Sequence, residues 1–270
     1  MPTFELDGVT LDYQVRGVGD PVVLICGCGQ PAIAWDLGVA PLLVAAGFSV
    51  VTFDNRGVAP SSSPPAPYTI AEMVDDTVGL LDHLGIGATR LAGYSMGGWI
   101  AETMCARLPE RVAAAALIGS CNVPTSWEKA ITSVELSIAR SGVELPRLFY
   151  ATETIRYLPN RELQDDAVVD AWLSMIGDME VWPNPGREGQ YAACMALSLD
   201  TDRMKVWPDL SVPILVLSFE HDVDSPPDRA RQAAAQIPGA RFTEIAGASH
   251  LGPMTHATAV AAELVSFFKE

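Results

Sequence analysis

Short apolar runs of strand length, each followed by a helical pattern, constrain the fold of this chain more than any other feature. The strand patterns occupy 21–26 (PVVLIC), 48–53 (FSVVTF), 89–93, 112–118, 213–219 (PILVLSF) and 241–245. The helical patterns occupy 35–46, 70–84, 96–108, 228–236 and 257–268. Runs that are apolar at every position are typical of parallel strands, which are covered on both faces. The alternation predicts an α/β fold with a mostly parallel central sheet and helices on both faces, and Asp7-Gly8 adds an antiparallel hairpin at its edge.

The alternation is interrupted between 119 and 213. Apolar residues recur there at helical spacing, in the series Trp127, Ile131, Val134, Ile138 and Val168, Trp172, Met175, Met179. We therefore expect a helical subdomain over 121–207, inserted into a core domain formed by 1–120 and 208–270. Inserted helices rich in aromatic residues are expected to cover an active site as a cap and to wall an apolar pocket. The alternative is a helical subdomain whose aromatic side chains only pack against one another.

The charge balance and the cysteines narrow the classes of function. The 270-residue chain has 17 Lys and Arg residues against 33 Asp and Glu residues, so its net charge of −16 argues against nucleic acid or an anionic membrane surface as a partner. No apolar run approaches the length of a membrane span, and the first residues lack the features of a signal peptide, so a cytoplasmic protein is expected. The five scattered cysteines suit free thiols, and no metal site is expected because no second Cys or His pair stands at zinc-finger spacing.

The stretch Gly93-Tyr94-Ser95-Met96-Gly97 lies on a turn from a strand pattern to a helical pattern. A glycine two residues to either side of a serine permits a turn so tight that the serine adopts a strained backbone conformation. The turn lifts the hydroxyl clear of the sheet and directs the first free N–H groups of the helix toward whatever the hydroxyl carries. This pattern is a nucleophile elbow, with Ser95 as the nucleophile. The same pattern also arises by chance in glycine-rich loops, so the interpretation depends on partners elsewhere in the chain.

A serine hydroxyl needs a base to take its proton, and the chain has four histidines. His250 follows the strand pattern at 241–245, and the carboxyl ends of strands are where sites form in open α/β sheets. His83 lies inside a helical pattern and His256 begins the last helix, so both are expected to be surface or capping residues. His221 stands too close to the candidate acids to be the base that they orient. His250 is therefore the expected base.

The base needs a carboxylate to orient it, and Glu220, Asp222 and Asp224 stand within five residues of one another. Glu220 directly follows an apolar run and is expected to belong to the end of the strand. Asp224 precedes a helix that it is expected to cap. Asp222 lies one step into the loop and is the preferred acid, with Asp224 as the open alternative. The chain order is then Ser95, Asp222, His250, which is the order of α/β-hydrolases and not that of chymotrypsin-like or subtilisin-like proteases.

With these motifs the chain resembles the α/β-hydrolase superfamily, specifically its capped, lid-bearing branch. The resemblance covers nearly the full length of the chain. It is carried by Phe53-Asp54-Asn55-Arg56-Gly57, by the Ser95 elbow, by the spacing of Asp222 to Pro226 and by Ser249-His250-Leu251-Gly252.

The resemblance implies an oxyanion hole made by the backbone N–H groups of Cys28 and Met96. Family members usually carry His-Gly where this chain has Cys26-Gly27-Cys28-Gly29-Gln30, so the histidine that normally braces this loop is missing. A main-chain donor does not depend on the identity of its side chain, so the hole is expected to persist. Cys28 is expected to be a wall of the pocket.

The resemblance further implies a serine hydrolase that cleaves an ester, thioester or similar acyl bond of a small, largely apolar substrate, without a cofactor. The expected substrate contacts are Trp35, Tyr94, Trp127, Trp172 and Leu251. One alternative is a natural-product tailoring enzyme of the same fold, which isomerises, cyclises or cleaves carbon–carbon bonds. Another is a protein that only binds a ligand, although a receptor has no need of a base. A monomer or a homodimer is expected.

Overall fold

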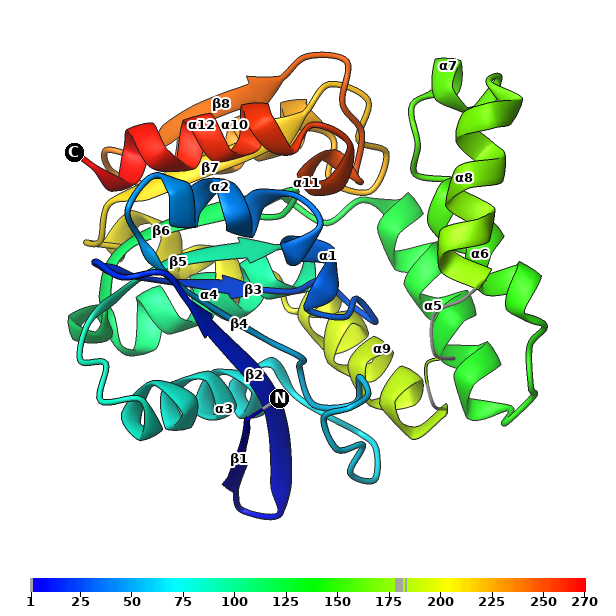
Figure 1. Ribbon diagram of the computed structural model, residues 1–270, viewed down its shortest axis with the longest axis horizontal. Coiled ribbons are helices and arrows are strands. Elements are labelled where there is room, and N and C mark those ends of the chain that lie inside the picture. Colours follow the sequence, from blue (N-terminus) through cyan, green and yellow to red (C-terminus); the bar gives the residue numbers. More distant parts are fainter. Residues whose placement is uncertain (1, 178–181, 183) are drawn as a thin grey trace.

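The computed structural model describes residues 2–177, 182 and 184–270, and its centre is an eight-stranded sheet (Figure 1). The strands are β1 (Thr3–Leu6), β2 (Val9–Arg16), β3 (Pro21–Ile25), β4 (Ser49–Phe53), β5 (Thr89–Tyr94), β6 (Val112–Ile118), β7 (Ile214–Phe219) and β8 (Arg241–Ile245). Their order is β1-β2-β4-β3-β5-β6-β7-β8. The pairs β1–β2 and β2–β4 are antiparallel, and every other neighbouring pair is parallel. The predicted α/β fold with a mostly parallel sheet is confirmed.

Helices cover both faces of this sheet, as the alternation of patterns predicts. They are α1 (Ile33–Asp36), α2 (Val39–Ala45), α3 (Ile70–His83), α4 (Met96–Arg107), α10 (Pro227–Ala234), α11 (Gly252–Thr255) and α12 (Ala257–Phe268). One core contains apolar side chains of α3, α4 and α10, and the other contains those of α2 and α12. Strands β3 to β7 are buried at nearly every position, in keeping with their largely apolar sequences.

The helix expected over 35–46 is wrong as a single element, because α1 and α2 are separate helices. The break falls at Gly38, whose φ of −143° and ψ of −87° are not helical. A β-carbon at Gly38 would lie 2.8 Å from the Ala257 side chain and 2.9 Å from the Pro253 carbonyl oxygen. The start of α12 therefore packs directly against the backbone at Gly38, and this tertiary contact overrides the helical pattern of the sequence.

The segment between β6 and β7 is helical, as the interruption in the strand pattern predicts. It contains α5 (Ser126–Arg140), α6 (Arg147–Ile155), α7 (Asn160–Leu163), α8 (Asp166–Gly177), α9 (Asn184–Leu199) and the 3₁₀ helix η2 (Thr201–Asp209). We refer to these elements as the inserted helices. Helix α5 packs on α9 and helix α6 packs on α8. Helices α5 to α8 stand at one end of the sheet, on the right in Figure 1, and α9 runs back toward the core.

Of the apolar series expected in α5, Ile131 and Ile138 are half-buried and the other two members lie outward. Trp127 and Val134 are each 54% exposed. The buried face instead carries Glu128, Thr132, Glu135, Leu136 and Ala139. The Glu128 carboxylate accepts hydrogen bonds from Asn122 Nδ2 at 3.1 Å and from Ser198 Oγ at 3.1 Å, so its burial is compensated by neighbours distant in sequence. In the second series, Met179 lies outside the described residues.

None of the helices in the described part of the chain combines the length and the apolar character that crossing a bilayer requires.

Candidate active site

Ser95 occupies the turn between β5 and α4 in a conformation that side chains rarely adopt. Its φ of 53° and ψ of −120° lie outside the common regions for L-residues. The flanking glycines permit this turn through close packing. A β-carbon at Gly93 would lie 2.1 Å from the Gly97 carbonyl oxygen, and one at Gly97 would lie 2.2 Å from the Ile25 carbonyl oxygen. Ser95 therefore stands at the N-terminus of α4 on a turn that only glycine neighbours allow.

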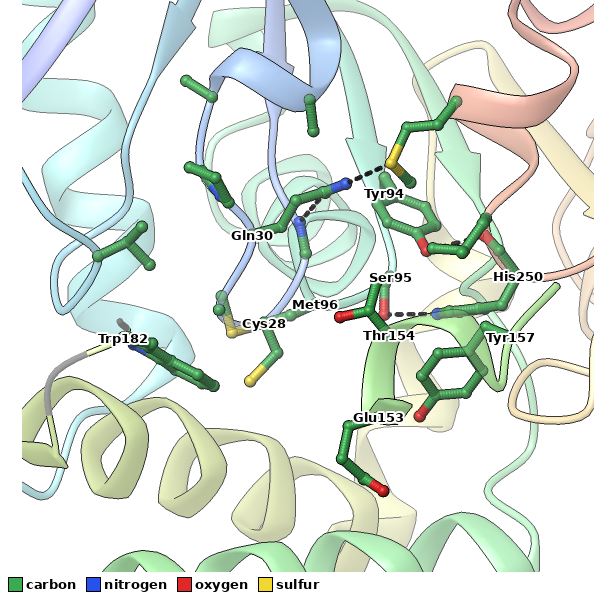
Figure 2. A pocket seen from close by; sticks show the side chains of 18 of the residues that line it. Cys28, Gln30, Tyr94, Ser95, Met96, Glu153, Thr154, Tyr157, Trp182 and His250 are labelled. Atoms are coloured by element: carbon green, nitrogen blue, oxygen red, sulfur yellow. Dashed lines mark hydrogen bonds between the residues drawn. The ribbon is translucent and has the colours of Figure 1, made fainter. Parts of the chain in front are cut away.

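Ser95, His250 and Asp222 form a continuous chain of close polar contacts. Ser95 Oγ lies 3.1 Å from His250 Nε2, and the two side chains point toward one another in Figure 2. His250 Nδ1 lies 2.8 Å from Asp222 Oδ2. The Asp222 side chain is fully buried, and its other oxygen, Oδ1, accepts the N–H groups of Asp224 at 2.9 Å and Ser225 at 2.8 Å. Each oxygen of the Asp222 carboxylate therefore has its own set of donors.

The charge of Asp222 controls the protonation of His250. Burial disfavours the charged imidazolium, but the negative charge of Asp222 and its hydrogen bond outweigh burial and raise the pKa of His250 to about 9. The arrangement therefore stabilises a positive charge on His250, which is the state that a general base reaches after it has accepted a proton.

Two tyrosine rings pack against the His250 imidazole. The Tyr94 ring centroid is 5.1 Å from that of His250, and the Tyr157 ring centroid is 5.3 Å away. Tyr94 Oη also donates to the His250 carbonyl oxygen at 2.8 Å. Tyr157 follows α6 and lies beside His250 in Figure 2. Sequence reasoning missed Tyr157, because no local motif links it to a residue so far along the chain.

The other candidate acids make different contacts. Glu220 accepts the Gly247 N–H at 2.8 Å and is partly exposed. Asp224 accepts a hydrogen bond from Trp127 Nε1 at 3.2 Å. The expectation that Asp224 caps the next helix is wrong, because the N-cap of α10 is Pro226 and no side chain caps it.

The other histidines lie apart from Ser95. His83 is exposed and its Nε2 lies 3.2 Å from the Tyr13 hydroxyl. His256 occupies the N-cap position of α12. The side chain of His221 is 53% exposed. The exposed position of His83 matches its expected surface role, whereas the half-buried His256 side chain makes no capping hydrogen bond.

The loop after β3 lies against Ser95, and its backbone is held by amide side chains. A β-carbon at Gly27 would lie 3.2 Å from the Ser95 β-carbon. Gln30 Oε1 accepts the Gly27 N–H at 3.2 Å, and Gln190 Oε1 accepts the Gly29 N–H at 2.7 Å. Within the described part of the chain, the N–H of Cys28, which lies between these two, has no hydrogen-bond acceptor. We call residues 26–30 the β3 loop.

The Cys28 side chain is half-buried. Burial, and then the adjacent thiol of Cys194, raise the pKa of the Cys28 thiol well above its ordinary value. A thiol in this state is a poor nucleophile. Together with its place in the lining of the cavity described next, this makes Cys28 a wall residue, as the sequence predicts.

A cavity of about 920 Å³ opens on Ser95 and His250. Its lining comes from the core and from the inserted helices, and of the expected contacts it includes Tyr94, Trp172 and Leu251. The expectations for the other two tryptophans are wrong. Trp35 is buried in the core at 2% exposure, and Trp127 points outward to bind Asp224. Lining residues that sequence reasoning missed include Trp99, Tyr157, Trp182 and Tyr191.

Charged side chains also line this cavity, on the side of the inserted helices. Arg156 forms ion pairs with Glu153 at 2.8 Å and with Glu135 at 3.7 Å. Burial, with a contribution from the neighbouring Glu153 carboxyl, raises the pKa of Glu135 to about 7. The cavity is therefore apolar near Trp172 and Leu251 but carries a charged cluster elsewhere in its wall. The described residues contain no group of three or more His, Cys, Asp or Glu side chains placed to hold a metal ion.

Comparison with known proteins adds to this geometry. A family model for the alpha/beta hydrolase fold matches residues 20–257. The chain is 31% identical over 261 residues to a Mycobacterium tuberculosis protein that carries the name non-heme bromoperoxidase BpoC, with 96% of this chain and 98% of that protein covered. The crystal structure of BpoC matches with a TM-score of 0.87 at 32% identity, over 96% of this chain and 95% of that chain.

Two further proteins of similar length resemble the chain. The enol-lactonase from Burkholderia xenovorans LB400 matches with a TM-score of 0.83 at 29% identity, over 100% of both chains. Rhodomycin D methylesterase of Streptomyces peucetius is 26% identical, with 94% of each chain covered.

Proposed function

The chain belongs to the α/β-hydrolase fold family, and from this premise we propose that it is a serine hydrolase that cleaves an ester, thioester or related acyl bond. The observation that carries the proposal is the continuous contact from Asp222 through His250 to Ser95, at 2.8 Å and 3.1 Å. The 3.1 Å distance lies within the reach at which a base takes the proton of a nucleophile, and the 2.8 Å distance is that of a hydrogen bond which orients the base. The names of the enol-lactonase and the methylesterase among the similar proteins agree with acyl chemistry.

In the proposed reaction Ser95 Oγ attacks the acyl carbon while its proton passes to His250 Nε2. The resulting imidazolium is stabilised by Asp222, which also keeps the remaining proton on Nδ1. The tetrahedral intermediate then collapses, the bond to the leaving group breaks, and the alcohol or thiol leaves with the proton from His250. A water molecule next gives a proton to His250 and attacks the acyl-enzyme. The acid product leaves, and Ser95 recovers its proton.

The negative charge of the tetrahedral intermediate needs donors that are already in place. We assign this role to the backbone N–H groups of Cys28 and Met96. The Met96 N–H is one of the first in α4 and has no partner within that helix, so the N-terminal end of the helix favours an anion there. The Cys28 N–H is flanked by two N–H groups that are already occupied, which supports its assignment as the second donor.

The inserted helices supply one side of the proposed substrate site. We propose that residues 121–207 form a cap over the core domain of 1–120 and 208–270. In support, Trp172 from α8 and Tyr157 line the cavity that opens on Ser95. The proposed substrate is a small molecule with an apolar acyl or alcohol group, which Tyr94, Trp172 and Leu251 would contact. A cavity of about 920 Å³ lies at the upper end of the usual range for ligand pockets, which leaves room for a small molecule of this kind.

The similarity to BpoC favours a second candidate function. An acyl-enzyme on Ser95 can be attacked by hydrogen peroxide in place of water, which releases a peroxy acid and the free serine. The same three side chains would serve both reactions. Two assays distinguish the peroxide reaction from hydrolysis. The first measures bromide oxidation in the presence of acetate and hydrogen peroxide, and the second measures ester hydrolysis in their absence.

The direct test of the proposed function uses p-nitrophenyl esters from acetate to laurate. We expect turnover with a preference for one range of chain lengths, and an initial burst of p-nitrophenol equal to the amount of enzyme where deacylation is slower than acylation. Ser95→Ala serves as the control for background hydrolysis. Turnover that is equal in the wild-type protein and in Ser95→Ala would contradict the proposed function.

A further inference from the structure

Gln190 joins the β3 loop to a second loop of the core. It lies on α9, one of the inserted helices, and has no exposed surface. Its Oε1 accepts the Gly29 N–H at 2.7 Å, and its Nε2 donates to the Arg56 carbonyl oxygen at 2.8 Å. One side chain thus connects backbone atoms of the β3 loop and of the loop after β4.

The orientation of the Gln190 amide is fixed by these partners. A backbone N–H can only donate and a backbone carbonyl can only accept, so exchanging the amide oxygen and nitrogen would break both hydrogen bonds. Because the Gln190 side chain has no exposed surface, water could not satisfy its amide in place of the lost partners. The side chain therefore has one stable arrangement, in which it holds both loops at once.

Helix α9 approaches the core closely enough for Gln190 to reach both loops because glycines lie at the contact. A β-carbon at Gly186 would lie 1.9 Å from the Gly57 carbonyl oxygen, and one at Gly189 would lie 2.4 Å from the Tyr68 ring. Side chains at these positions would push the helix away from the core. The start of α9 is thus seated against the loop that contains Arg56.

The β3 loop is tied on both sides of Cys28. Asn55 Nδ2 donates to the Cys26 carbonyl oxygen at 3.1 Å, and Gln30 accepts the Gly27 N–H. Gln190 supplies the contact on the other side of Cys28, at Gly29. Of these three amides, only Gln190 comes from the inserted helices.

We propose that Gln190 is a positioning residue for the oxyanion hole, which it serves by fixing the direction of the Cys28 N–H. This inference rests on the proposed function, because it assumes that an oxyanion forms beside Ser95. Gln190 does not touch the reacting atoms and acts only through the backbone of Gly29 and Cys28. The inserted helices would then support catalysis directly, besides forming a wall of the cavity.

The test is Gln190→Met, which keeps the length of the side chain and removes both hydrogen bonds. Complete loss of one oxyanion donor lowers kcat about 10²–10³-fold in a serine protease. A displaced donor is expected to lower kcat by about tenfold to a hundredfold, with little change in KM. Binding of a trifluoromethyl ketone, which forms an oxyanion on Ser95, is expected to weaken in the same proportion. An unchanged kcat together with unchanged ketone affinity would overturn the inference, and so would a change in KM alone.

Gln190→Glu provides the conservative variant. An oxygen still accepts the Gly29 N–H, and burial favours the protonated carboxyl, which can still donate to the Arg56 carbonyl. We expect its kcat to exceed that of Gln190→Met at least several-fold below neutral pH. If Gln190→Met does not fold, Gln190→Glu is compared with the wild type instead, and a kcat ratio that does not fall as rising pH ionises the introduced carboxyl would overturn the inference. Equal kcat losses in two folded variants would overturn the inference.

The matched control is Ser198→Ala, on the same helix. Ser198 is as deeply buried as Gln190 and bonds to Glu128, away from the β3 loop. We expect this variant to lose stability without losing kcat, and an equal loss of kcat would indicate a general loosening of α9 and overturn the inference. Labelling of Ser95 by a fluorophosphonate distinguishes a failure of the proposed function from a failure of the inference about Gln190. A wild-type protein that is inert overturns the proposed function and the inference together, whereas a reactive wild type with an equally reactive Gln190→Met overturns the inference alone.

Discussion

Asp222→Asn is the substitution whose outcome the structure determines most closely. Asp222 Oδ1 accepts two backbone N–H groups, and Oδ2 faces His250 Nδ1. In the asparagine variant the amide oxygen should take the Oδ1 position, since an NH₂ group there would oppose two donors. The amide nitrogen then faces His250 Nδ1 and donates to it. The imidazole is forced to carry its proton on Nε2, and it cannot accept the proton of Ser95.

The magnitude follows from the cost of the opposite amide orientation. Turning the amide over would leave two buried N–H groups without acceptors, at about 1–3 kcal/mol each. The two groups together cost about 2–6 kcal/mol, which makes the productive orientation roughly 30-fold to 10⁴-fold less populated. The corresponding substitution in a serine protease lowers kcat about 10⁴-fold, which is about 5.5 kcal/mol of barrier at 1.36 kcal/mol per tenfold. We expect a loss of about 10³-fold to 10⁴-fold here.

The assay is the steady-state hydrolysis of the best p-nitrophenyl ester by the wild type, Asp222→Asn and Asp224→Asn. Asp224→Asn weakens the hydrogen bond from Trp127 and removes a charge that raises the pKa of His250 less than Asp222 does, so it should cost about tenfold or less. Thermal unfolding of each variant checks that the fold is kept. If Asp222→Asn retained activity within tenfold of wild type while Asp224→Asn lost nearly all of its activity, the acid of the triad would be Asp224 and the assignment of Asp222 would be wrong.

Three further outcomes follow from the same geometry. Ser95→Ala should lower turnover at least about 10³-fold with an unchanged melting temperature; near-wild-type turnover of the native substrate would rule out an acyl-enzyme. Cys28→Ser should keep kcat within about threefold in the same assay, because the assigned donor is a backbone N–H; a variant as inactive as Ser95→Ala would implicate the thiol. Because His250 must be neutral to accept a proton and its pKa is raised, kcat/KM should increase with pH through a midpoint above the usual 6.5 for histidine. Asp222→Asn removes the charge that raises this pKa, so the midpoint of its residual activity should lie at lower pH. An unmoved midpoint would contradict the assignment of this rise in kcat/KM to the deprotonation of His250.

The sheet could be predicted from the sequence because its strands are buried on both faces. Burial favours Val, Ile, Leu and Phe at most positions, as in β3, β4 and β7. The inserted helices could be predicted as helices, but the sequence did not predict which of their side chains point inward. In α5 the outward position of Trp127 and the inward position of Glu128 depend on Asp224, Asn122 and Ser198, which are remote in sequence. Periodicity alone carries no information about such partners.

The candidate site likewise contains residues that the sequence predicts and residues that it does not. Ser95, Asp222 and His250 could be brought together from the sequence, because each follows a strand of one parallel sheet and the carboxyl ends of those strands share an edge. Gln190 and Tyr157 could not be found in this manner. Their contacts are to backbone atoms and to a ring face, and such partners leave no motif in the sequence. Trp35 was misassigned because a tryptophan beside the β3 loop packs equally well into the core below it.

Activation of Ser95 as a nucleophile by His250 can be measured by mass spectrometry of a covalent adduct. The protein is incubated with a fluorophosphonate, and the modified residue is identified by peptide mapping. We expect one adduct per chain, on Ser95, with a labelling rate that falls by orders of magnitude in His250→Gln. No adduct on Ser95, or an adduct that forms equally fast in the wild type and in His250→Gln, would contradict it.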